Sequence, residues 1–201
     1  MSRKVVESWN RIAAWLEAHA PEMLKLLQSP VSQEQLDAAA AEMGLVFPND
    51  FVAFYQIVDG YDPDDDPSSI FPSWDEWDDV AFGPLALEAI VQEWKMLKEL
   101  LDGGDFAGLA PDSAQGVAND WWHPGWIPFA DNGGGDYVCI DMAPAEGGRA
   151  GQVISHSHES GEHRVLATSL ADYLNDLADA LEDNTLEYSE EDGVRRRRSD
   201  D

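Results

Sequence analysis

Three histidines in the second half of the chain have residue types and spacing that come closest to a metal site. His156 and His158 are two residues apart in the stretch HSHESGEH, and His163 closes that stretch. Alternate side chains of an extended strand point to the same face, so His156 and His158 could bind zinc together, with His163 joining them across a turn. The spacing matches no established ligand pattern, and such a polar turn is typical of a solvent-exposed hairpin tip. We therefore predict no resident metal or cofactor, and keep the three histidines as weak candidate ligands.

A run of three glycines offers a second kind of chemistry, phosphate binding, in WIPFADNGGGDYVCIDMAP, residues 126–144. A phosphate loop needs glycines that open a helix, or glycines followed by Lys and then Ser or Thr. Here no lysine follows, and the next segment has the pattern of a strand. Asp131, Asp136 and Asp141 would also repel a phosphate. The run therefore predicts a β-hairpin turn, with Asp131 and Asp136 on its rim as contacts for a protein partner.

An acidic segment with two tryptophans, residues 61–79, is the main candidate for a binding surface. Its alternating aspartates suggest calcium, but Pro67 stands where an EF-hand loop requires glycine. Tryptophan among carboxylates favours a protein-binding patch, in which the ring is an anchor and the charges steer a basic partner. The alternative is that the tryptophans pack under the loop and the acids form a solvated rim. The predicted contacts are Asp62, Asp64, Asp65, Asp66, Trp74, Asp75, Glu76, Trp77, Asp78 and Asp79.

The overall charge points to the same class of partner. The chain has 201 residues, with 40 acidic against 12 basic, for a formal net charge of −28. Such a field repels nucleic acid and anionic membranes and attracts basic proteins, although plain solubility or an acidic proteome would give the same balance. The single cysteine, Cys139, lies in the apolar run YVCI, which indicates a buried thiol in a reducing compartment. No signal-peptide or membrane-span pattern is present, so we expect a cytoplasmic protein.

The elements that must position these residues change in type along the chain. Apolar residues at three- and four-residue steps predict helices within residues 5–16, 32–43, 49–60 and 86–102, and a short helix is expected at 21–27. Residues 103–120 have a loop composition. The runs WIPFA, DYVCIDM, GQVISHSH and HRVLAT then predict a strand meander, followed by a helix that begins at Ser169. The pattern predicts an α+β fold, with an antiparallel-rich mixed sheet packed against N-terminal helices and a C-terminal helix. We expect one domain over residues 1–186 and a charged, disordered tail over 187–201.

Two blocks of the sequence together resemble a known family. The later block contains WIPFA, the acidic glycine turn, YVCIDMAP, GQVI and the serine-led final helix. The earlier block is AAAEMGLVFPNDFVAFYQIVDG, in which Asp59 stands where the family commonly has Asn. Over residues 30–184 the chain resembles the SMI1/KNR4 family, the core of the SUKH superfamily. The resemblance implies a non-enzymatic α+β binding domain without catalytic residues or a ligand. Bacterial members are typically immunity proteins that neutralise polymorphic toxins, often nucleases, and fungal relatives coordinate cell-wall glucan synthesis with signalling.

Three hypotheses for function follow. The leading one is a cytoplasmic immunity protein that masks a basic, nuclease-type toxin through residues 61–79, by steered docking and burial of aromatic anchors. The alternative is a regulatory or scaffold interaction protein, similar in role to the fungal relatives. A third, from a different class, is a metal-dependent hydrolase that uses His156, His158 and His163. The first two involve no catalysis, and none of the three involves nucleic acid or a membrane as the partner.

Overall fold

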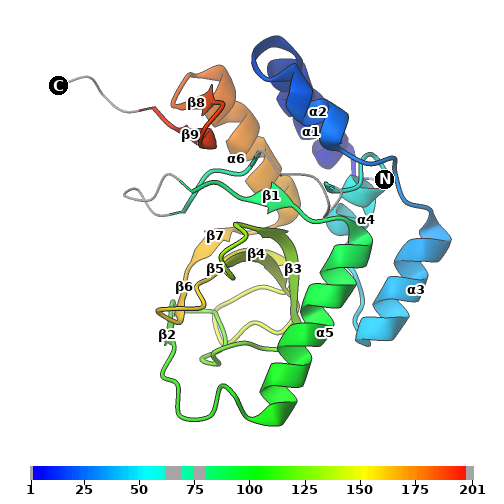
Figure 1. Cartoon of the computed structure of the whole chain (residues 1–201). Coiled ribbons are helices and arrows are strands. Elements are labelled where there is room, and N and C mark those ends of the chain that lie inside the picture. Colours follow the sequence, from blue (N-terminus) through cyan, green and yellow to red (C-terminus); the bar gives the residue numbers. More distant parts are fainter. Residues whose placement is uncertain (1, 62–68, 75–79, 198–201) are drawn as a thin grey trace.

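The structure is a computed structural model that describes residues 2–61, 69–74 and 80–197 (Figure 1). The helices within these ranges are α1 (Arg3–His19), α2 (Pro21–Leu26), α3 (Gln33–Met43), α4 (Asn49–Tyr55), α5 (Leu87–Gly103) and α6 (Leu170–Glu182). Among the described residues, no helix combines the length and the apolar character needed to cross a bilayer. Each helix that the sequence predicts is present. α4, however, ends at Tyr55, five residues before Gly60, which was expected to end it.

Local signals set the ends of two helices as the sequence predicts. At the start of α3, the hydroxyl of Ser32 accepts a hydrogen bond from the amide of Gln35, and the Gln35 side chain accepts one from the amide of Ser32. Gly44 ends this helix with a φ of 68°, a conformation that costs glycine little. Ser169 begins α6, because its hydroxyl accepts a hydrogen bond of 3.1 Å from the amide of Asp172.

A five-stranded sheet forms the second half of the domain. Its strands are β1 (Gly83–Pro84), β3 (Trp126–Asp131), β4 (Tyr137–Asp141), β5 (Gln152–His156) and β7 (Val165–Ala167), in the spatial order β1-β3-β4-β5-β7. Every neighbouring pair is antiparallel. The glycine run joins β3 to β4, so the expected hairpin is confirmed, and the mixed α+β fold with helices packed against the sheet is confirmed as well.

Helices cover one face of the sheet and flank its edge. Phe129 of β3 contacts Phe71 and Tyr173 of α6, with ring centroids 5.8 and 6.1 Å apart. α1 packs on the outer side of α6, where Arg11 pairs with Asp179 at 2.6 Å and with Glu182. α5 runs along β3, and α3 lies beside α5 (Figure 1). The buried residues of these elements form one continuous apolar core.

The segment that was expected to be a simple loop, residues 103–120, contains a short strand. β2 (Asp112–Ser113) pairs in parallel with β6 (Glu162–His163), in a two-stranded sheet separate from the main one. The amide of Asp112 donates to the carbonyl of Gly161, and the amide of Ala114 donates to the carbonyl of His163. This pairing fastens the loop after α5 to the turn that follows β5. Two residues per strand leave no alternating pattern in the sequence, so it was not predicted.

The expectation of a disordered tail over residues 187–201 needs correction for the part that the structure describes. β8 (Leu186–Ser189) and β9 (Gly193–Arg196) form an antiparallel hairpin. Leu186 and Val194 are buried, and the amide of Val194 donates to the carbonyl of Ser69. The side chain of Arg195 pairs with Glu187 and Asp192, which neutralises charges that had suggested disorder. Burial and charge pairing thus order a segment whose composition alone is typical of a solvated tail.

Candidate functional site

Most of the predicted acidic surface falls outside the described residues. This holds for Asp62, Asp64, Asp65, Asp66, Asp75, Glu76, Trp77, Asp78 and Asp79. Trp74 is described, is partly buried, and packs against Phe82 with ring centroids 4.5 Å apart. It also lines a pocket of about 270 Å³ between α6 and the β8–β9 hairpin, together with Tyr173 and Arg196. Trp74 thus combines partial packing with an accessible surface, and its role as an anchor stays a prediction.

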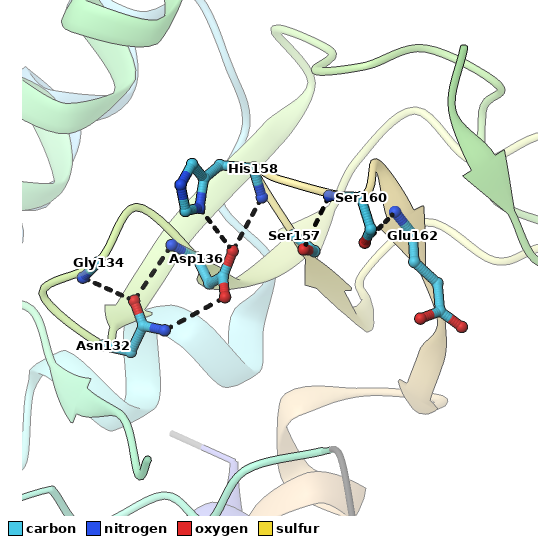
Figure 2. Close-up of polar contacts among 7 residues, drawn as sticks. All are labelled: Asn132, Gly134, Asp136, Ser157, His158, Ser160 and Glu162. Atoms are coloured by element: carbon cyan, nitrogen blue, oxygen red, sulfur yellow. Dashed lines mark hydrogen bonds and ion pairs between the residues drawn. The ribbon is translucent and has the colours of Figure 1, made fainter. Parts of the chain in front are cut away.

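The glycine turn between β3 and β4 is tied to the turn after β5, as Figure 2 shows. The side-chain carbonyl of Asn132 accepts hydrogen bonds from the amides of Gly134 and Asp136, at 2.9 and 3.1 Å. The carboxylate of Asp136 in turn accepts from the amide of His158 at 2.8 Å and contacts its ring Nδ1 at 3.0 Å. Asp136 therefore links two turns that are 22 residues apart in the chain. This carboxylate has a structural role, and its contact with a partner stays a prediction.

The second turn has its own serine-based hydrogen bonds (Figure 2). The hydroxyl of Ser157 accepts from the amide of Ser160 at 3.4 Å, and the hydroxyl of Ser160 accepts from the amide of Glu162 at 3.2 Å. Gly161 lies against the ring of Trp121, where a Cβ would approach a ring carbon to 2.5 Å, and its φ is 65°. The turn is thus shaped by side chains that bind their own backbone.

Asp131, at the end of β3, lies in an electrostatic environment that disfavours its charge. Burial and then repulsion by Glu93 raise the pKa of Asp131 to about 6. Glu93, on α5, accepts a hydrogen bond of 2.7 Å from the hydroxyl of Tyr137. Glu93 is therefore near enough to Asp131 to affect its charge, and Asp131 is partly withdrawn from solvent. Its role as a partner contact also stays a prediction.

The structure does not bring the three candidate metal ligands together. His156 and His163 are 1% and 0% exposed, and their rings are stacked with centroids 5.2 Å apart. His158 instead lies with Asp136, more than two-fifths exposed. Within the described ranges, no group of three or more His, Cys, Asp or Glu residues is placed to hold a metal ion. Strand alternation suggested that His156 and His158 share a face. It does not apply here, because β5 ends at His156 and the chain turns there.

Asp59 is a buried carboxylate that sequence reasoning did not select. The segment 59–61 lies between the end of α2 and the start of α5, and its backbone bonds to both sides: the amide of Asp59 donates to the carbonyl of Gln28, and the amide of Tyr61 donates to the carbonyl of Pro84. Gly60 has no space for a side chain, since a Cβ would lie 2.1 Å from the carbonyl carbon of Leu85. The glycine therefore serves close backbone approach and not the end of a helix.

The carboxylate of Asp59 is held at the amino end of α5. Its Oδ1 accepts hydrogen bonds from the amides of Gly60 and Leu87, at 2.9 and 2.8 Å. Because Leu87 is the first residue of α5, Asp59 caps this helix from a distant part of the sequence. Burial raises the pKa of Asp59, and the two amide hydrogen bonds oppose that rise.

A pocket of about 640 Å³ opens over this carboxylate, between α3 and α5. Asp59, Glu42 and Glu88 supply carboxylates to its lining. An ion pair between Lys95 of α5 and Glu42 of α3 lies at the pocket, with both side chains about half exposed. The sequence signals for this site are weak: an Asp-Gly pair at positions 59 and 60, which a turn would explain equally well, and an Asp where the resembled family commonly has Asn.

Comparison with known proteins places the fold and these sites in context. The family model described as SMI1/KNR4 family (SUKH-1) matches residues 30–176. The chain is 29% identical to the cell wall biosynthesis/cell cycle regulator smi1 of Schizosaccharomyces pombe, over 96% of this chain and 39% of that protein. It is 26% identical to a glucan synthesis regulatory protein of Neurospora crassa, over 88% of this chain and 38% of that protein. With the cell wall assembly regulator SMI1 of Saccharomyces cerevisiae it shares 22% identity, over 87% of this chain and 40% of that protein. The chain therefore spans two-fifths or less of the length of these relatives.

Proposed function

The chain belongs to the SMI1/KNR4 family, and from this premise we propose that it is a non-catalytic domain that regulates another protein by binding it. The observation that carries the proposal is the similarity, over 87% to 96% of this chain, to proteins described as regulators of cell-wall synthesis. The alternative hypothesis from the sequence, a regulatory interaction protein, thus has more support than the immunity role. The process that this chain regulates is a proposal, since the matched part of each relative is less than half of that protein.

The charge of the chain supports a basic partner. A formal net charge of −28 gives the protein a field that attracts positively charged surfaces and raises their rate of encounter. The charges on the described residues are mostly exposed and at the surface, as in the pairs of Arg3 with Glu7 and Lys25 with Glu22. Such exposed pairs contribute little to folding, so the large acidic excess has more consequence for association than for stability.

The chemistry of the buried reactive groups supports binding without catalysis. Cys139 is fully buried, and burial raises the pKa of its thiol well above the usual value, so the thiolate nucleophile is disfavoured. Burial lowers the pKa of His156 to about 3, which leaves a neutral ring with no access to a substrate. The carboxylates of Asp136 and Asp59 are engaged with backbone amides. These groups act in holding the fold together.

A second candidate function is the immunity role. The acidic excess favours it, because a nuclease presents a basic surface where it grips phosphate and an acidic inhibitor can cover that surface. In this case the partner is a toxin, and binding abolishes its activity.

Cross-linking inside the cells that encode this chain tests the proposal and separates the two roles. A tagged chain should cross-link to a basic protein, and the purified pair should reassociate at low salt. Partner activity that is tuned but retained in the complex supports regulation, whereas a lethal toxin that the chain neutralises supports immunity. A purified partner with an acidic or neutral surface, or conversion of a substrate by this chain alone, would contradict the proposal.

A further inference from the structure

We propose that the pocket between α3 and α5 receives an arginine side chain of the partner, whose guanidinium group binds the Oδ2 atom of Asp59. The inference rests on the proposed function, because it takes the partner to be a basic protein. It goes further by naming the site and the residue type that the site recognises. α3 and α5, the two helices that form the pocket, lie side by side at one edge of the molecule (Figure 1).

Asp59 is a buried residue, and only one of its two carboxylate oxygens accepts hydrogen bonds from the described residues. The residue is 7% exposed, and both of its hydrogen bonds, from Gly60 and Leu87, go to Oδ1. Within the described residues, Oδ2 accepts no hydrogen bond. Because Oδ2 is not a buried atom without a partner, it meets solvent, and a cation bound there would replace water. Asp59 is one of the residues that line the pocket, so a ligand that enters the pocket meets this residue.

Capping of α5 uses only one oxygen of the Asp59 carboxylate. An asparagine caps a helix about as well as an aspartate, and its side-chain oxygen would accept the same two amide hydrogen bonds. Burial raises the pKa of Asp59, so the charged form is less favourable here than in water. The feature that an amide would lack is the second oxygen with its negative charge. The negative charge also favours the amino end of α5, but the second oxygen accepts no hydrogen bond from the described residues and is therefore free to bind a ligand.

The remaining lining of the pocket matches the two parts of an arginine. Apolar side chains, among them Val31 and Val91, offer a surface for the methylene stem. Glu88 and Gln92 add acceptors to Asp59, and the planar fork of a guanidinium can bind several acceptors at once, which a lysine ammonium does less well. Among the described residues that line the pocket, Lys95 is the one basic residue, and it is already paired with Glu42. An incoming arginine would compete with it for the same acidic surroundings.

A titration followed by NMR tests the pocket without the natural partner. The probe is N-acetyl-arginine methylamide, and the matched neutral probe is N-acetyl-citrulline methylamide. The signals to follow are the backbone amides of Gly60 and Leu87, because they donate to the carboxylate in question. We expect saturable shifts of both signals with the arginine probe and none with the citrulline probe. Equal shifts with both probes, or equal binding of the corresponding lysine probe, would overturn the assignment of arginine.

Three variants make the test specific. Asp59→Asn keeps the cap of α5 and should weaken binding of the arginine probe by about tenfold or more. Lys95→Gln removes the competing cation and should strengthen binding by about two- to threefold. Asp112→Asn removes the same charge from an exposed position on β2 and should leave binding unchanged. If Asp59→Asn binds the probe as well as the wild type does, or if Lys95→Gln weakens binding, the inference fails. If a basic partner binds without shifting the Gly60 and Leu87 signals, the pocket is not its binding site, but the proposed function is still supported.

Discussion

The rings of His156 and His163 are stacked inside the protein with their centroids 5.2 Å apart, and neither Nδ1 atom has a hydrogen-bond partner in the described structure. Burial first, and then the proximity of His163, lower the pKa of His156 to about 3 from an ordinary value of 6.5. In the unfolded chain the same ring takes up a proton near its ordinary pKa. The pair therefore contributes stability that is fully present above about pH 6.5 and is lost as the pH falls towards the folded pKa.

Replacement of His156 by a residue that does not titrate should make the free energy of unfolding depend less on pH in the acid range. Each proton taken up only by the unfolded chain lowers the free energy of unfolding by about 1.4 kcal/mol per pH unit. We expect His156→Phe, which keeps a ring beside Tyr137, to show a smaller fall in melting temperature between about pH 7 and pH 5 than the wild type. Thermal denaturation at a series of pH values measures the difference. Parallel curves for the two proteins would show that His156 does not titrate in this way.

Asp131 should change the pH dependence of stability in the opposite direction to His156, over an overlapping pH range. Its pKa is raised to about 6 from 3.8, so the folded state holds its proton more tightly than the unfolded chain does. The stability from this proton is present below the unfolded pKa and is lost as the pH rises through about 6. We therefore expect Asp131→Asn to raise the free energy of unfolding by about 1 kcal/mol at pH 8 and to have little effect at pH 4. Chemical denaturation at both pH values is the measurement, and an equal effect at each pH would disprove the coupling.

The hydrogen bonds between Asp136 and His158 should hold the turn between β3 and β4 against the turn that follows β5. Asp136→Ala removes an acceptor for the His158 amide and its ring, and leaves that amide without its partner. We expect a loss of about 1 to 3 kcal/mol in the free energy of unfolding, with faster hydrogen exchange at the His158 amide. Asp136→Asn is the control, because its side-chain oxygen can still accept from the amide. Unchanged exchange at His158 in the alanine variant would mean that other contacts fix this turn.

Gly60 should tolerate no side chain. A Cβ would come within 2.3 Å of the Leu85 carbonyl carbon and the Ala86 nitrogen, both of which are backbone atoms that cannot turn aside. We expect Gly60→Ala to cost more than about 3 kcal/mol, because segment 59–61 must move away from the start of α5. Gly134→Ala is the control, since the nearest atom to its Cβ would be the side-chain Oδ1 of Asn132 at 3.3 Å, and no backbone atom lies as close as at Gly60. Similar melting temperatures for the two alanine variants would contradict this account of Gly60.

The helices and the strand meander were predictable because their signals are local. The Ser32–Gln35 capping pair lies within four residues, and the apolar runs of β3, β4 and β5 each lie within one segment. The hairpin of β8 and β9 was missed because the density of charge in residues 187–197 outweighed the two buried positions, Leu186 and Val194. Composition gives the number of charges, but it does not show that Arg195 pairs with Glu187 and Asp192 in the folded chain.

The site at Asp59 was hidden for a related reason. Its function as a cap requires Leu87, 28 residues later, and its position requires the backbone of Gln28 on the other side. No spacing rule in a single sequence connects these three residues. The histidines show the converse error: their spacing suggested a shared face, but the end of β5 at His156 sends His158 to Asp136. Local pattern predicts elements well, whereas sites depend on where the elements meet.

The measurement that tests the central claim most directly is the association rate constant of the purified partner with the wild-type chain and with a variant carrying Asp64→Ser, Asp65→Ser and Asp66→Ser, at low and high salt. If this domain acts by charge-steered binding of a basic protein, the wild-type rate should fall steeply with salt. The triple variant should associate several-fold more slowly at low salt, with little change in its dissociation rate. An association rate that is insensitive to both salt and the substitutions, or an effect confined to dissociation, would contradict the claim.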